Sequence, residues 1–132
     1  MSKELIEQAV AGYFDNMVAM NPQGWVDNFA EDGIVYDPVG NPPSIAHETF
    51  QDFFGMLSSF FKNIEISKDS IFISANQAAV KWTMKVVAKN DKNASTEGIS
   101  IFEINEAGKI QKVSAYWDDT ALRSQLQGSK NS

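Results

Sequence analysis

The fold is decided by a stretch in the second half of the chain, residues 79–88, which reads AVKWTMKVVA. Apolar and polar side chains alternate along it, which is the pattern of a β-strand with one buried face. Val80, Trp82 and Met84 share the apolar face, and lysines dominate the other. We therefore predict a strand of an antiparallel sheet that packs one face on a core and leaves the other in solvent.

The same alternation recurs on both sides of this stretch and predicts a run of strands separated by turns. We place these strands at 64–74, 78–90, 96–105 and 109–118. The 96–105 strand is apolar on both faces, because Ile99 and Ile101 alternate with Ser100, Phe102 and Ile104. Such a strand needs cover on both sides, so we predict a homodimer through the outer face of the sheet.

The first half of the chain has helical spacing instead. Ser2 is placed to cap a first helix, and Asn21-Pro22 ends that helix and begins a short second one. We expect Trp25 and Phe29 to anchor the second helix and Gly33 to end it. A first strand would then run over residues 34–37.

A third helix follows a proline-containing turn, and a short closing helix is predicted over residues 120–127. The apolar face of the third helix consists of Phe50, Phe53, Phe54, Leu57 and Phe61. Helices followed by antiparallel strands are typical of an α+β domain with helices on one face of a curved sheet. We predict one domain over residues 1–128 and a disordered tail at 129–132.

Composition excludes several classes of function. The chain has 132 residues, no cysteine, one histidine and a net charge of −6. Thiolate metal sites and disulfides are therefore impossible, and zinc would lack ligands. The acidic balance disfavours nucleic acid and anionic membranes as partners. Without a signal-peptide pattern or a membrane-spanning run, we expect a cytoplasmic protein.

Asp37 is the first candidate for chemistry. It follows the apolar residues Ile34-Val35-Tyr36 and begins the turn that runs from Pro38 to Pro43. A carboxylate at the end of a buried strand is unfavourable unless it is paired or used. The simpler interpretation is that Asp37 caps the turn by accepting hydrogen bonds from backbone amides.

The motif Asp37-Pro38-Val39-Gly40, with Tyr13 upstream, resembles the bacterial ketosteroid isomerases of the nuclear-transport-factor-like, SnoaL-like superfamily. The similarity extends over nearly the whole chain. It implies a cone-shaped, curved antiparallel sheet wrapping three helices around an apolar pocket, a cystatin-like α+β barrel. It also implies a hydrophobic small-molecule ligand and no metal or organic cofactor. This scaffold hosts many chemistries, so the fold alone names no reaction.

The resemblance implies roles for individual residues. Asp37 matches the general base and Tyr13 the hydroxyl donor that stabilises an enolate oxygen. Ser100 falls where the family has a protonated aspartate as second donor, and Phe54 replaces a supporting tyrosine. The resemblance therefore predicts that a Δ5-3-ketosteroid turns over slowly or not at all. The expected ligand-binding residues are Trp25, Phe54, Trp82, Met84, Phe102, Trp117 and Asp118.

Three other functions remain open on the sequence. Tyr116-Trp117-Asp118 resembles the C-terminal pattern of SnoaL-like polyketide cyclases, in which Asp118 would be the base. The simpler role of the pair Asp118-Asp119 is to cap the closing helix. The aromatic and methionine-rich pocket walls also suit a carrier or sensor of an apolar molecule. A protein-interaction module using the outer sheet face is the last alternative.

Overall fold

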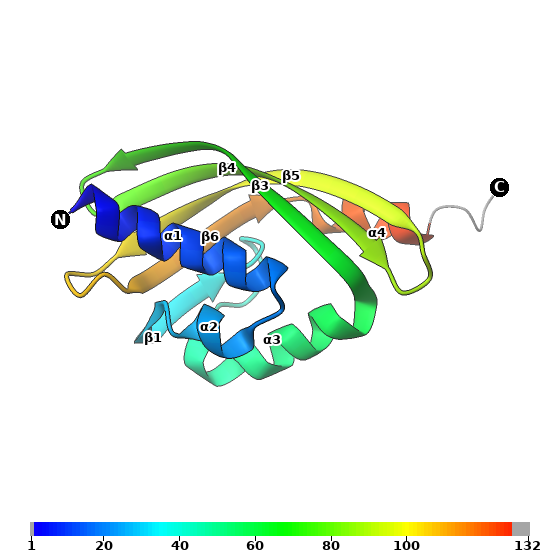
Figure 1. Ribbon diagram of the computed structural model, residues 1–132, viewed down its shortest axis with the longest axis horizontal. Helices are drawn as coiled ribbons and strands as arrows, with labels where there is room; N and C mark the ends of the chain where they lie inside the picture. The colour runs from blue at the N-terminus through cyan, green and yellow to red at the C-terminus, as the bar shows by residue number, and fades with distance from the viewer. Residues whose placement is uncertain (1, 128–132) are drawn as a thin grey trace.

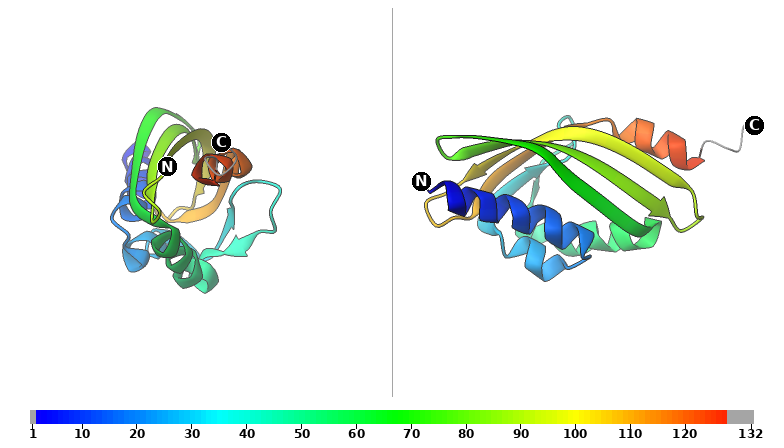
Figure 2. Two further views of the ribbon diagram at one scale, coloured as in Figure 1. Left: turned by 90° about the vertical axis from the view of Figure 1, so that its right-hand side faces the viewer. Right: turned by 45° about the horizontal axis from the view of Figure 1, so that its top comes forward.

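The structure of the chain is a computed structural model, and it describes residues 2–127. One long, curved sheet forms the body of the molecule (Figure 1). Three helices pack on its concave side, and a fourth lies at one end of the sheet beside strand β5, Asn93–Ile104 (Figures 1 and 2). The predicted α+β class is confirmed, and the predicted tail at residues 129–132 lies outside the described residues.

The first two helices begin at the residues predicted to cap them. Helix α1 spans Lys3–Val18, and the Leu5 N–H donates to the Ser2 hydroxyl at 3.4 Å. Helix α2 spans Pro22–Val26, with Asn21 as its cap. Phe29 was predicted to belong to this helix, and that prediction is wrong. The helix ends at Val26, and Phe29 is the first residue of strand β1, Phe29–Tyr36.

Gly33 does not end a helix but lies inside β1, where the pairing register shifts between Phe29 and Ile34. A Cβ at Gly33 would lie 2.7 Å from the carbonyl oxygen of Ile110, so the close approach of strand β6, Ile110–Trp117, requires glycine here. Asp37 therefore follows an eight-residue strand, whereas the sequence predicts it as the last residue of a four-residue strand over 34–37.

The remaining elements lie close to the predicted ranges. They are β2 Ser44–Ile45, α3 Ala46–Phe60, β3 Phe61–Ser74, β4 Gln77–Ala88, β5 Asn93–Ile104, β6 Ile110–Trp117 and α4 Asp119–Gln127. Phe61 begins β3 and is not part of the third helix. The two-residue strand β2 was not predicted, because so short a segment carries no periodicity.

The strand order is β2-β1-β6-β5-β4-β3, and every pairing is antiparallel except that of β1 with β6. The sheet curves but does not close into a barrel, because β2 and β3 remain at its edges. Register shifts in β3, between Phe61 and Asn63 and between Lys68 and Ser70, contribute to the curvature. Bulges of this kind bend a strand and increase its twist.

The concave face carries the core, as the alternation predicted. Val80, Trp82 and Phe102 are buried there, and Tyr13 of α1 packs edge-on against Phe102 with ring centroids 5.0 Å apart. On the convex face, Ile99 keeps 46% of its surface exposed. No helix within residues 2–127 is long and apolar enough to cross a membrane.

Candidate functional site

Asp37 is held beside β6 by the turn that it begins. Strands β1 and β6 run parallel, and Tyr36 is paired with Ser114. Just after Asp37, the Val39 N–H donates to the carbonyl of Ala115 at 2.8 Å. The turn therefore lies against the end of β6, which brings Asp37 next to Trp117.

The Asp37 carboxylate is half-buried and is bound by an indole. The Trp117 Nε1–H donates to Asp37 Oδ1 at 2.7 Å. Burial raises the pKa of Asp37 above its ordinary value, the Trp117 hydrogen bond lowers it, and the charge of Asp119 raises it further. Among the described residues, Oδ2 accepts no hydrogen bond. The carboxylate is thus oriented through one oxygen, and its other oxygen is available.

Tyr13 projects from α1 into the interior and is 3% exposed. Burial raises the pKa of its phenol well above the ordinary value, and the charge of Asp37 raises it further. The two groups therefore interact electrostatically. Within residues 2–127, the Tyr13 hydroxyl forms no hydrogen bond, so its proton is free to bind another acceptor.

Ser100 lies on the concave face of β5 and is 1% exposed. The Trp82 Nε1–H donates to its Oγ at 2.9 Å. Because the serine oxygen accepts this bond, its own O–H proton remains to be donated elsewhere. The rings of Trp82 and Trp117 meet edge-to-face with centroids 6.0 Å apart, which links the neighbourhood of Ser100 to that of Asp37.

The other predicted lining residues fall into two groups. Trp25 and Phe54 belong to an aromatic cluster on the helical side, with ring centroids 5.6 Å apart. Trp25 is also 5.6 Å from Tyr13, and its Nε1 is buried without a hydrogen-bond partner in the described part of the chain. Met84 and Phe102 are buried on the sheet side.

Asp118 is placed differently from the other predicted site residues. Its side chain is exposed, and its Oδ1 accepts the Ala121 N–H at 2.9 Å, as expected of a residue that caps α4. The next residue, Asp119, forms an ion pair with Arg123 and contributes to the field at Asp37. The sequence predicts Asp119, together with Asp118, as a cap of the closing helix and not as a site residue, because nothing in its spacing separates it from an ordinary first-turn acid.

Helix α4 is fixed to the sheet by side chains. Gln125 Oε1 accepts from the Ser95 N–H at 3.0 Å, and Gln125 Nε2 donates to the Ser95 carbonyl at 2.9 Å. Leu122 is buried in the core. The pairing of β6 with β5 ends at Trp117 and Gly98, so α4 covers the part of β5 that β6 does not reach.

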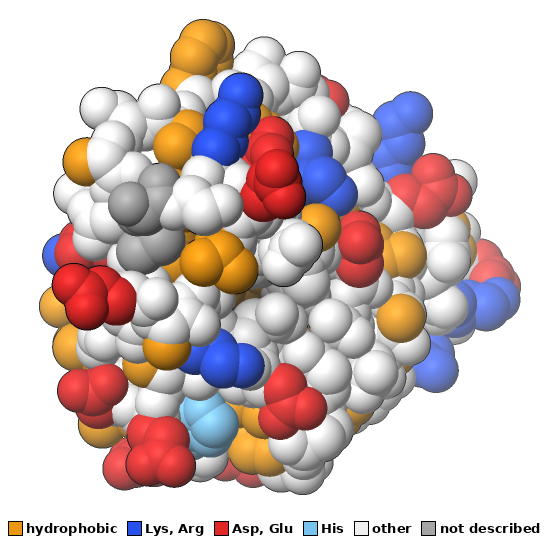
Figure 3. Space-filling view, turned by 60° about the vertical axis from the view of Figure 1, so that its left-hand side comes forward, with side chains coloured by type: hydrophobic (Ala, Val, Ile, Leu, Met, Phe, Trp, Pro, Cys, Tyr) orange, Lys and Arg blue, Asp and Glu red, His pale blue; other side chains and the backbone are white. Residues whose placement is uncertain are grey.

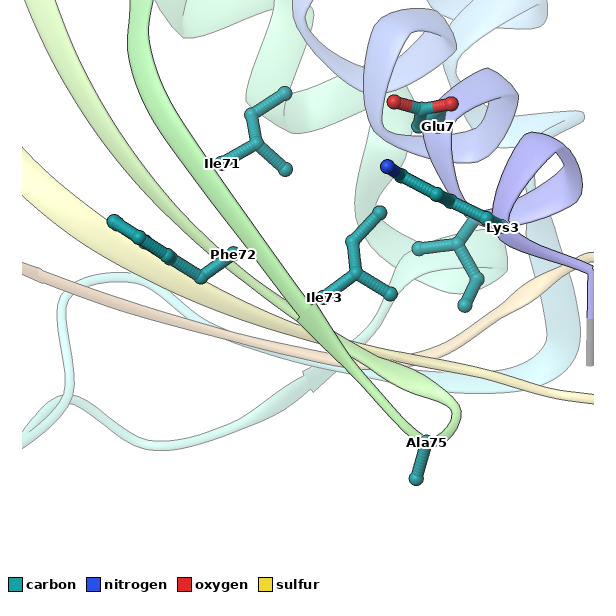
Figure 4. A pocket seen from close by; sticks show the side chains of 7 residues that line it. Lys3, Glu7, Ile71, Phe72, Ile73 and Ala75 are labelled. Carbon is teal, nitrogen blue, oxygen red and sulfur yellow. The ribbon is translucent and has the colours of Figure 1, made fainter.

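Two hollows occur elsewhere on the described surface. The first, of about 340 Å³, lies between Lys3 and Glu7 of α1 and the end of β3. Figure 4 shows Ile71 and Ile73 pointing toward α1 and Phe72 pointing away. The second, of about 400 Å³, adjoins Gln125 of α4 and the β4–β5 end. Neither hollow is lined by Asp37 or Tyr13.

The part of the chain that the structure describes contains no preformed metal-binding site. No group of three His, Cys, Asp or Glu side chains there is arranged to hold one. The face shown in Figure 3 carries acidic and basic side chains interspersed rather than a continuous field of one sign.

Comparison with known protein families identifies the chain. The model of the SnoaL-like domain matches residues 10–113. The chain belongs to the SnoaL-like domain family. No curated protein matches it in sequence. The resemblance inferred from the motif around Asp37 is therefore confirmed at the level of the family.

Solved structures of other proteins share the fold of this SnoaL-like chain. A Δ5-3-ketosteroid isomerase from Mycobacterium sp. has a TM-score of 0.74 and 17% identity, over 89% of this chain and 95% of that one. An M. tuberculosis LEH-like epoxide hydrolase has a TM-score of 0.78 and 16% identity, over 96% and 92%. The epoxide hydrolase/cyclase-like enzyme SalBIII has a TM-score of 0.78 and 17% identity, over 91% and 95%. At these identities the likeness establishes the fold, a cone-shaped sheet around helices.

Proposed function

We propose that this SnoaL-like protein is an enzyme that moves a proton next to the carbonyl group of a hydrophobic small molecule, with Asp37 as the base. The observation that carries the proposal is that the Asp37 carboxylate is hydrogen-bonded through only one of its two oxygens among the described residues. Trp117 holds one of its oxygens at 2.7 Å, and the other has no partner among the described residues. Burial strengthens it as a base by raising its pKa.

Two groups of the chain share the proton transfer: Asp37 carries the proton, and Tyr13 stabilises the negative charge that develops on the oxygen. Asp37 takes a proton from the carbon next to the carbonyl, and the C–H electrons form the enolate. Tyr13 donates a hydrogen bond to the enolate oxygen, and because its pKa is raised it stays protonated while Asp37 is ionised. If the substrate carries a C=C bond one carbon further along, the enolate is a dienolate, and the Asp37 acid returns the proton to its far carbon, which moves the C=C bond into conjugation with the carbonyl and completes an isomerisation.

The half-buried Asp37 carboxylate also restricts the substrate. The nearby groups, Tyr13, Trp82, Ser100 and Trp117, carry no positive charge, so an anionic substrate would be repelled by Asp37. The proposed substrate is therefore an uncharged ketone or a related carbonyl compound. Asp118 supports the cyclase alternative poorly, because its carboxylate is exposed and caps α4.

The test is deuterium exchange, which needs no knowledge of the natural substrate. β-Tetralone, an uncharged aromatic ketone, is incubated with the protein in D2O, and exchange at the carbon next to the carbonyl is followed by NMR. Asp37→Asn should abolish the protein-dependent exchange, and Tyr13→Phe should reduce it. Asp52→Asn, which changes an exposed carboxylate on α3, serves as the matched control.

Three outcomes separate the alternatives. Exchange that survives Asp37→Asn but is lost in Asp118→Asn would refute Asp37 as the base and favour the cyclase-type site. Ketone binding without exchange, unchanged by Asp37→Asn, would indicate a carrier. Exchange that rises with pH through the raised pKa of Asp37, and is absent from Asp37→Asn, would support the proposal.

A further inference from the structure

Gly98 lies between the two tryptophans of the candidate site. Strand pairing places Trp82 of β4, Gly98 of β5 and Trp117 of β6 in one row across the sheet. Residues paired in this way share a face of the sheet, so both indoles stand on either side of a position that has no side chain. The two rings meet at 6.0 Å with an angle of 69° between their planes.

A side chain at position 98 has no room in this arrangement. A Cβ there would lie 2.6 Å from the carbonyl oxygen of Tyr116, 2.7 Å from Cζ2 of Trp82 and 2.8 Å from Cβ of Trp117. All three distances are shorter than carbon atoms tolerate. One of these atoms is backbone and another is a Cβ, so neither can turn aside by a rotamer change.

The two indoles that meet beside Gly98 each hold one polar group of the site. Trp82 Nε1 donates to Ser100 Oγ at 2.9 Å, and Trp117 Nε1 donates to Asp37 Oδ1 at 2.7 Å. A shift of either ring would lengthen or tilt its hydrogen bond. Hydrogen bonds weaken steeply as distance and angle depart from the optimum, so that bond would hold its polar group less firmly.

We propose that Gly98 is a positioning residue: by leaving space for Trp82 and Trp117 to meet, it sets the placement of both the Ser100 hydroxyl and the Asp37 carboxylate. The catalytic meaning of this placement rests on the proposed function. The placement itself does not, because it can be measured without a substrate. A glycine that served packing alone would affect stability and leave the two indole hydrogen bonds unchanged.

The three tryptophans of the chain provide the measurement. Their indole N–H groups give separate ¹H–¹⁵N NMR signals, and each has a different environment. Trp117 donates to a carboxylate, Trp82 donates to a hydroxyl, and Trp25 has no partner among the described residues. Asp37→Asn and Ser100→Ala assign the first two signals, and Trp25, in the helical aromatic cluster, is the internal reference.

Gly98→Ala is expected to shift the Trp82 and Trp117 signals together and to leave the Trp25 signal in place. In the wild type, the Trp117 signal should follow the titration of Asp37, whose charged or titratable neighbours are Tyr13 and Asp119. Gly98→Ala should diminish or remove that titration. β-Tetralone exchange, if the wild type shows it, should fall about tenfold or more, because a small misplacement of a catalytic group slows the reaction by that order.

The matched control is Gly55→Ala in α3, where an added Cβ meets nothing within 4 Å. It should leave all three indole signals unchanged. If Gly98→Ala does not fold, Trp82→Phe replaces it, and this change should shift the Trp117 signal through the lost ring contact.

Unmoved Trp82 and Trp117 signals in folded Gly98→Ala, or an unmoved Trp117 signal in Trp82→Phe, would overturn the inference. An equal shift of all three signals in Gly98→Ala would overturn it as well, because that result indicates a general change of packing. If the wild type exchanges no ketone but the signals move as expected, the proposed function fails and the positioning role stands.

Discussion

Replacing Ser100 with aspartate tests the isomerase hypothesis at its weakest point, the absence of a second acidic donor. Ser100 is 1% exposed, and its oxygen accepts the Trp82 N–H. In Ser100→Asp, one oxygen of the new carboxyl group can take over that role, and the other can carry a proton. Ionisation in this buried site costs several kcal/mol, so the neutral acid is the favoured form.

The expected gain in transition-state stabilisation and the expected loss of folding stability are each a few kcal/mol. One donor to a developing oxyanion is worth about 3–4 kcal/mol, which corresponds to about 10²–10³ in rate. Adding atoms at a position that is almost fully buried costs about 1–3 kcal/mol of stability through overpacking. A domain of this kind is stable by about 5–15 kcal/mol, so Ser100→Asp should still fold.

The assay follows the ultraviolet absorbance of the conjugated enone formed from a Δ5-3-ketosteroid. The wild type should show little or no turnover, and Ser100→Asp should raise it about 100-fold. Ser100→Asn introduces a side chain of nearly the same size as aspartate but without an acidic proton, so it should give a much smaller increase in turnover. Combining Ser100→Asp with Asp37→Asn should remove the gain. A folded Ser100→Asp variant that binds the steroid but isomerises it no faster than the wild type would refute the reasoning.

Three further predictions concern assembly and stability. Light scattering at micromolar concentration should report a homodimer of twice the 14.6 kDa chain mass, and Ile99→Lys on the exposed face should shift it to monomer; a wild-type monomer would contradict this. Asp69, whose hydrogen bonds from Thr83, Ser67 and Lys81 lower its pKa from 3.8 to about 2, should stabilise the fold fully above pH 3.8 and lose this effect as the pH falls toward 2. Acid-unfolding curves of wild type and Asp69→Asn should therefore converge at low pH, and a constant difference would refute the assignment. Leu122→Ala should lower the free energy of unfolding in urea by about 2–5 kcal/mol, whereas an exposed change such as Ser124→Ala should alter it by less than about 0.5 kcal/mol.

Alternation along the strands was sufficient to predict most of the fold. The buried face of β4 and the two apolar faces of β5 follow directly from period two, because each side chain reports its own side of the sheet. The sequence predicts β1 too short, because Phe29 to Gly33 has no such alternation. Its first part is held by a shifted register with β6, and a register shift depends on the partner strand rather than on the local sequence.

The candidate site could be predicted from sequence only as a set of residues. Asp37 and Trp117 are 80 positions apart, and their hydrogen bond depends on the parallel pairing of β1 with β6. The helical and antiparallel signals of the chain do not predict that pairing. The sequence predicts Trp82 and Trp117 as apolar pocket walls, and strand alternation does not reveal the partners of their N–H groups. Gly98 did carry a signal, because a glycine inside a strand often marks close approach of a neighbour.

The use of indoles instead of charged side chains determines what Asp37 can do. An arginine or lysine at position 117 would orient the carboxylate at least as firmly. Its positive charge would also stabilise the ionised form and lower the pKa of Asp37 by about 1–3. The base would then be ionised but weak. The uncharged Trp117 N–H orients Asp37 with a smaller effect on its proton affinity, so burial remains the larger influence and the pKa stays raised. The same argument applies to Ser100, which Trp82 orients without adding charge. An interior that holds its polar groups only with neutral donors keeps its carboxylate basic, and that property suits abstraction of a proton from carbon.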